Sequence, residues 1–143
     1  MTIRSSSTAV RLWAGIDLAV TLPMAIPPWA LWFVDTLWRL NALLGGQDTA
    51  GPVDTLYLFF LFLAGTLGVT WALARLVRPS RTLSVIDALA RLWVAGLIVY
   101  CVTVYDAPPV LLAFVLTEVA GAAHQAWSLF VTTRQTPSTA GAG

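Results

Sequence analysis

The stretch TLYLFFLFLAGTLGVTWALA, residues 55–74, contains no charged side chain. A helix needs about 20 mostly apolar residues to cross a hydrocarbon core of about 30 Å. Residues 55–74 have this length and composition, and we therefore predict that they form a transmembrane helix.

The composition of the whole chain points the same way. Of its 143 residues, 58% are hydrophobic and only 10% are charged, and its mean hydropathy is +0.79. Soluble domains carry about 25% charged residues. We predict an all-α fold, an integral membrane four-helix bundle with the lipid bilayer as its main surroundings.

Three other apolar stretches flank this helix and complete the bundle. The four spans are predicted at about residues 10–28, 53–76, 83–105 and 109–131, within one membrane domain of residues 10–132. Residues 1–9 and 133–143 are small and polar, and we expect them to be disordered. A cleavable signal peptide is not expected, because Asp17 would interrupt its apolar core.

The segment WALWFVDTLWRLNALLGG, residues 29–46, follows three prolines and is amphipathic. Its apolar residues Trp29, Trp32, Phe33, Leu37 and Leu40 recur at helical spacing, and Asp35 and Arg39 lie one turn apart on the other side. Such helices lie in the membrane interface. We therefore predict an interfacial helix at about residues 29–44. The alternative is that these residues extend a long, kinked first span.

Arginine placement predicts the orientation, because the chain has no lysine. Cytoplasmic segments of membrane proteins are enriched in Lys and Arg. Arg4 and Arg11 lie before or at the start of the first span. Arg75, Arg78 and Arg81 lie between the apolar stretches 55–74 and 83–105, and Arg134 follows the fourth span. We expect a multi-pass protein of the bacterial inner (plasma) membrane with both termini in the cytoplasm.

Several ionisable residues fall inside the predicted spans. Arg91 lies ten residues beyond Arg81, hence about 15 Å deep at 1.5 Å per residue. Glu118 reaches a similar depth from the opposite face, so the two side chains could meet. Asp87 precedes Arg91 by one helical turn, and Asp17 falls at a level compatible with Asp87.

Each such residue costs about 3 kcal/mol to insert, so it normally turns inward and finds a partner. Three acids here outnumber Arg91. At least one acid should therefore be neutral, reach water or pair with His124. The structural alternative is that these residues only hold the helices together, as interhelical polar contacts do.

The fourth span carries LTEVAGAAHQAW, residues 116–127. At helical spacing Glu118, Gly121 and Gln125 share one stripe, and His124 lies beside it. Trp13, Trp93 and Trp127 are candidates for the walls of a ligand cavity.

These segments carry a resemblance to known families. The tryptophan-rich segment ending in LLGG, the motif ARLWVAGL around Arg91, YDAPP and LTEVAGAAHQAW resemble the small four-helix proteins of the DoxX-like group. The same layout resembles the EXPERA proteins, which include sterol isomerases and lipophile-binding proteins. The resemblance implies a role for Glu118, His124 and Asp17 in proton transfer at a double bond. DoxX-like relatives include membrane subunits of quinone-linked oxidoreductases.

Several function classes are excluded. No glycine-rich phosphate loop is present, and a net charge of +1 argues against binding of nucleic acid. One histidine and one cysteine cannot assemble the usual haem, zinc or copper ligand sets. We expect no cofactor and no metal.

Two hypotheses remain. In the first, the bundle binds a small lipophilic molecule such as a sterol, terpenoid or quinone. Its candidate ligand-binding residues are Arg91, Asp87, Gln125, Trp13, Trp93 and Trp127. A catalytic version is an acid–base isomerase that uses Glu118, His124 and Asp17.

In the second hypothesis, the chain is an accessory subunit of a larger, quinone-linked oxidoreductase complex. It would pack through small-residue faces such as Ala64, Gly68 and Ala72. Such faces also suit a homo-oligomer.

Overall fold

The computed structural model describes residues 3–46 and 54–134, and this part of the chain is helical without any strand. Its elements are α1 (Ile3–Ala25), α2 (Pro27–Leu43), α3 (Thr55–Val77), α4 (Arg81–Val104), the short 3-10 helix η1 (Pro109–Leu111) and α5 (Leu112–Arg134). Helix α1 thus includes most of residues 1–9, for which the sequence predicts disorder. Residues 135–143, most of the tail predicted to be disordered, lie outside the described residues.

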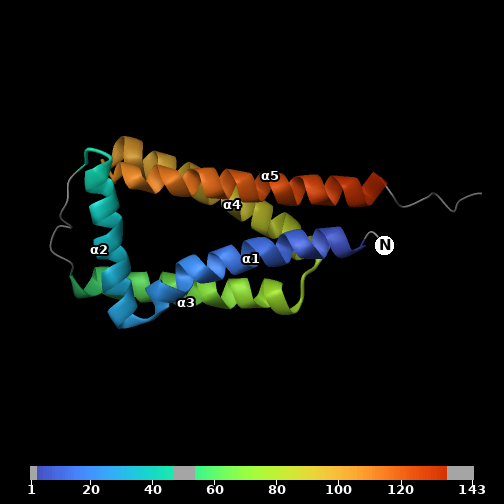
Figure 1. Cartoon of the computed structure of the whole chain (residues 1–143), viewed down its shortest axis with the longest axis horizontal. Coiled ribbons are helices and arrows are strands. Elements are labelled where there is room, and N and C mark those ends of the chain that lie inside the picture. The colour runs from blue at the N-terminus through green and yellow to red at the C-terminus, as the bar shows by residue number, and fades with distance from the viewer. Residues whose placement is uncertain (1–2, 47–53, 135–143) are drawn as a thin grey trace, which may run out of the picture.

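The long helices form two pairs. Helix α1 runs along α3, α4 runs along α5, and α1 also contacts α5 (Figure 1). Helix α2 crosses one end of the molecule. The start of α1, the connection from α3 to α4 and the end of α5 lie at the opposite end (Figure 1).

Three helices are long and apolar enough to cross a membrane: Thr55–Val77, Arg81–Val104 and Pro109–Val131. Helices α1 and α2 meet this criterion of length and hydropathy only when they are taken together. The pair consists of Ser7–Ala25 and Pro27–Leu43 and is bent by 109°. The candidate spans therefore number three, or four if the bent pair is one span.

The prolines explain the bend. Ile26 precedes Pro27 and is extended, with φ −112° and ψ 112°, as expected because proline disfavours helical backbone in the residue before it. Proline at the first position of the next helix is well tolerated, since that N–H has no partner within the helix. Residues 29–44 consequently belong to a helix that runs at a steep angle to α1.

Glycines bring α1 against α3. A Cβ atom on Gly65 would lie 2.8 Å from Cβ of Met24, and one on Gly68 would lie 2.8 Å from Cβ of Thr21. Ala72, one turn beyond Gly68, is fully buried. Of the predicted small-residue face of α3, Gly68 therefore lies against α1 and Ala72 is buried, whereas Ala64 is exposed.

Burial is inverted relative to a soluble domain. The largest fully buried side chains are Arg75, Gln125, Val10, Asn41 and Ser84. Large apolar side chains are exposed on every long helix, among them Leu12, Phe59, Phe60, Leu89 and Leu116. The interior therefore holds charged and polar side chains beside small apolar ones such as Ala14 and Ala72, and large apolar side chains lie on the outer surface.

Candidate functional site

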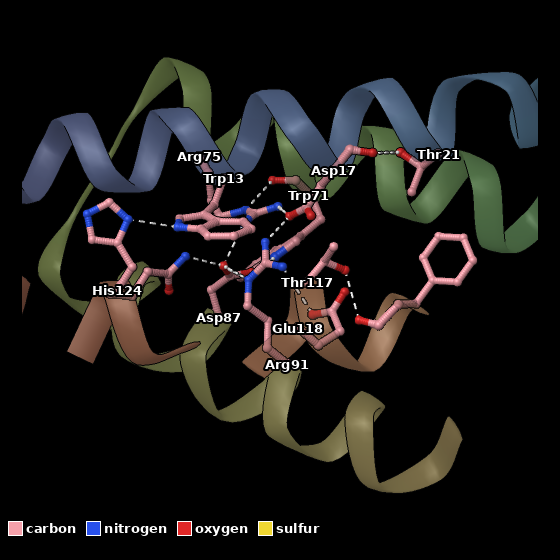
Figure 2. A network of polar contacts seen from close by, with 12 residues as sticks. Trp13, Asp17, Thr21, Trp71, Arg75, Asp87, Arg91, Thr117, Glu118 and His124 are labelled. Atoms are coloured by element: carbon pink, nitrogen blue, oxygen red, sulfur yellow. Dashed lines mark hydrogen bonds and ion pairs between the residues drawn. The ribbon is translucent and has the colours of Figure 1, made fainter. Parts of the chain in front are cut away.

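A network of five charged side chains joins all four long helices (Figure 2). Asp17 comes from α1, Arg75 from α3, Asp87 and Arg91 from α4, and Glu118 from α5. We refer to these five residues as the charged network.

Asp87 is its centre, and its two oxygens accept four hydrogen bonds. Oδ1 accepts from Nε1 of Trp71 at 2.8 Å. Oδ2 accepts from Arg75 at 2.6 Å, from Nε2 of Gln125 at 2.6 Å and from Nε of Arg91 at 3.0 Å. The predicted pairing of Asp87 with Arg91 along one helix face is confirmed, and α3 and α5 contribute partners to the same carboxylate.

Asp17 joins α1 to the network through both guanidiniums. Its Oδ2 accepts from Nη2 of Arg75 at 2.5 Å and also from Nη2 of Arg91. Both arginines therefore bridge Asp17 and Asp87, in agreement with the prediction that these acids lie at compatible depths.

Glu118 completes the network on α5. Its Oε2 accepts from Nη1 of Arg91 at 3.0 Å, which confirms the predicted contact between these side chains. Gly121, one turn further along α5, leaves the space that Arg91 occupies: a Cβ there would lie 3.0 Å from both Cδ and Nε of Arg91.

The prediction that Arg75 lies in the cytoplasmic connection between the second and third spans is wrong. Helix α3 continues to Val77, and the Arg75 side chain is fully buried. Its guanidinium lies over the ring of Trp71, 5.5 Å from the ring centroid. The spacing of Gly68, Ala72 and Arg75 at i, i+4 and i+7 is the signal that places Arg75 on the face toward α1.

His124 has a different partner from those predicted. Its Nδ1 accepts a hydrogen bond from Nε1 of Trp13 at 3.0 Å, and the two rings meet edge to face. Trp13 also lies under the guanidinium of Arg91, whose Cζ is 5.2 Å from its ring centroid. Within the described residues, no carboxylate forms an ion pair with His124.

A cavity of about 300 Å³ lies beside the charged network. All five network residues line it, together with Trp13, Trp71 and apolar side chains of α1, α4 and α5. Gln125 and His124 are not among its lining residues. Trp93 and Trp127 are also outside the lining and are 71% and 66% exposed.

The five network residues are paired with one another. Across residues 3–46 and 54–134, no three histidine, cysteine or carboxylate side chains are placed to share a metal ion. Asp87 and Arg91 are nearly buried, whereas the side chains of Asp17 and Glu118 are 21% and 19% exposed. Asp17 and Glu118 are therefore the most exposed charged groups of the cavity lining.

Comparison with models of known families, with curated proteins and with solved structures finds no match to this chain. The resemblance to the DoxX-like and EXPERA proteins stays a prediction.

Proposed function

We propose that this chain is an integral membrane protein that binds a small lipophilic molecule in the cavity beside the charged network. The observation that carries the proposal is the cavity itself. Asp17, Arg91 and Glu118 line it together with the apolar side chains of Ile16, Val20, Val94 and Phe114. An apolar pocket with a few convergent polar groups is the usual form of a site for a small molecule.

The inverted burial supports membrane insertion. Exposed apolar side chains on every long helix suit contact with lipid, and intramembrane ionisable residues normally face the bundle interior. In this proposal α1, α3, α4 and α5 cross the membrane. Helix α2 lies at the interface, with Trp29 and Trp32 exposed and the Asp35–Arg39 pair, at 2.9 Å, open to solvent.

The ends of the molecule support the proposed orientation. One end holds the start of α1, the α3–α4 connection and the end of α5 (Figure 1). These segments carry Arg11, Arg78, Arg81 and Arg134. The positive-inside rule places this end in the cytoplasm, as in a bacterial inner membrane, without any contribution from Arg75.

The arrangement supports binding more directly than acid–base isomerisation. A general acid and its partner base must both reach the reacting molecule. His124 does not line the cavity and accepts a hydrogen bond from Trp13. The accessory-subunit hypothesis gains no support from the face of Gly68 and Ala72, because α1 covers it.

The proposal is tested by purification in a mild detergent, followed by mass spectrometry of the hydrophobic molecules that remain bound. Wild-type protein should carry one lipophilic compound in near-stoichiometric amount. Val20→Trp, which fills the cavity without touching an ion pair, and Glu118→Gln should each lower the amount about tenfold or more.

Asp35→Asn is the matched control, since it removes an acid that lies outside the cavity lining. It should retain the compound at the wild-type level. Circular dichroism checks that each variant is helical. A folded, monodisperse wild-type protein with an empty extract would contradict the proposal, and so would an unchanged amount in folded Val20→Trp.

A further inference from the structure

Every nitrogen of the two guanidiniums beside the cavity donates to one protein acceptor. In Arg75, Nε donates to the carbonyl of Trp71 at 3.4 Å, and both terminal nitrogens donate to acids. In Arg91, Nε donates to Asp87, Nη1 to Glu118 and Nη2 to Asp17. Of the five N–H groups of each guanidinium, these bonds thus use three.

The uncharged donors that line the cavity are engaged in the same way. Trp71 donates to Asp87 and Trp13 donates to His124. The hydroxyl of Thr21 donates to the carbonyl of Asp17, and that of Thr117 donates to the carbonyl of Phe114, both at 2.8 Å. A ligand that offers only acceptors would have to displace one of these bonds or use a second N–H group of an arginine.

The acceptors, by contrast, are not all used. Asp17 receives both arginines on Oδ2, and Glu118 receives Arg91 on Oε2. Across residues 3–46 and 54–134, no donor reaches Oδ1 of Asp17 or Oε1 of Glu118. Gln125 Oε1, fully buried beside Asp87, is a further acceptor without a donor in this part of the chain.

The charges add to this imbalance. Three carboxylates, Asp17, Asp87 and Glu118, face two guanidiniums, Arg75 and Arg91, so the network has a formal charge of −1 when all five groups are ionised. Electrostatic attraction is stronger in a low-dielectric interior than in water.

We propose that the cavity selects lipophilic molecules with a cationic, hydrogen-bond-donating head group, namely protonated aliphatic amines. The ammonium would donate to the open oxygens of Asp17 and Glu118, and the apolar body would contact Val20, Val94 and Phe114. This inference rests on the proposed function and narrows its ligand class to molecules that both carry a positive charge and donate hydrogen bonds. An alcohol donates a hydrogen bond but has no charge, and a quinone has neither property.

Binding of a matched series of adamantane derivatives to the purified protein tests the inference. The compounds share one compact apolar cage and carry an amine, a hydroxyl or a ketone. Isothermal titration in a non-ionic detergent at neutral pH, with empty micelles as the reference, measures each affinity. Aminoadamantane should bind about tenfold tighter than adamantanol, and adamantanone should bind more weakly still.

Glu118→Gln tests the same inference in the protein. The ratio of the affinity for the amine to the affinity for the alcohol should fall about tenfold. Asp35→Asn, which changes the net charge equally, should keep the wild-type preference.

The outcomes separate this inference from the proposed function. Saturable binding of the ketone at least as tight as that of the amine overturns the amine preference but leaves a lipophile site. Absence of saturable amine binding also overturns the amine preference. Mass spectrometry of the hydrophobic molecules that co-purify with the protein then decides independently whether the cavity holds a neutral lipophile. If Glu118→Gln does not fold, the wild-type series alone decides.

Discussion

Replacement of Arg75 by methionine tests the charged network most directly. The guanidinium is fully buried and donates to Asp17 at 2.5 Å and to Asp87 at 2.6 Å. Methionine fills much of the same space without charge. The formal charge of the network would change from −1 to −2, because three acids would share Arg91 alone.

Two estimates of the loss in the free energy of unfolding caused by Arg75→Met differ enough for an experiment to distinguish them. If the two contacts act only as interhelical hydrogen bonds, at about 0.6 kcal/mol each, the loss is about 1.2 kcal/mol. Removal of one partner of a buried ion pair instead costs about 3–5 kcal/mol, because it leaves an uncompensated buried charge. Since Arg75 has no exposed surface, we predict a loss in the free energy of unfolding of about 3 kcal/mol or more.

Reversible unfolding in mixed micelles, titrated with sodium dodecyl sulfate and followed by circular dichroism, measures this loss. Arg78→Met is the matched control: Arg78 lies three residues away and is exposed, so its replacement should change stability by less than about 0.5 kcal/mol. In a double-mutant cycle with Asp87→Asn, the coupling should be about 1–3 kcal/mol. A loss below about 1 kcal/mol, or equal to that of Arg78→Met, would refute the buried ion-pair network.

Two further predictions concern glycines. Gly121→Ala should destabilise the protein by about 1–2 kcal/mol, because the added Cβ would lie 3.0 Å from atoms of Arg91 that three acids hold in place. Gly96→Ala, with nothing within 4 Å, should be neutral or slightly stabilising in the same unfolding titration, and equal effects at the two sites would contradict the proposed packing. Gly65→Ala should cost about 2 kcal/mol or more, because the Cβ would press on the backbone of α1. Gly15→Ala, which also meets nothing within 4 Å, serves as its control, and a Gly65→Ala protein as stable as wild type would show that α1 and α3 are less close.

Hydropathy was sufficient to predict the apolar helices, and depth along the helices was sufficient to predict the contact between Arg91 and Glu118. Apolar stretches of adequate length identify α3, α4 and the segment Pro109–Val131. Counting residues from the two faces predicts that Arg91 and Glu118 meet, because a straight helix has a fixed rise per residue. The same counting places Asp17 level with Asp87.

Arg75 was missed because an arginine near the end of an apolar stretch normally marks the membrane boundary. What distinguishes Arg75 is its face on the helix, and this matters only once α1 is known to pack against that face. The pairing of α1 with α3 depends on the fit between Gly65, Gly68 and the residues of α1, which no periodicity within one helix encodes.

The partner of His124 likewise could not be predicted from the sequence of one helix. Its position beside the stripe of Glu118 and Gln125 fixes its angle around α5 but not the neighbour that it meets. In the structure that neighbour is Trp13 on α1. Trp93 and Trp127 have the same aromatic character as Trp13, but their faces on α4 and α5 turn outward, and both are exposed.

Stability alone is a poor explanation for a charged network in this bundle. In the proposed membrane setting each ionisable side chain would cost about 3 kcal/mol to insert, and buried ion pairs can often be replaced by apolar residues without loss of stability. Gly65 and Gly68 already bring α1 against α3 without any charge. A network that served only to hold helices would also gain from equal numbers of acids and arginines, whereas this one has an excess acid. The two carboxylate oxygens of Glu118 can serve ion pairing and the proposed ligand binding at the same time. Oε2 accepts a hydrogen bond from Arg91, whereas Oε1 has no donor in the described chain and could accept one from a ligand.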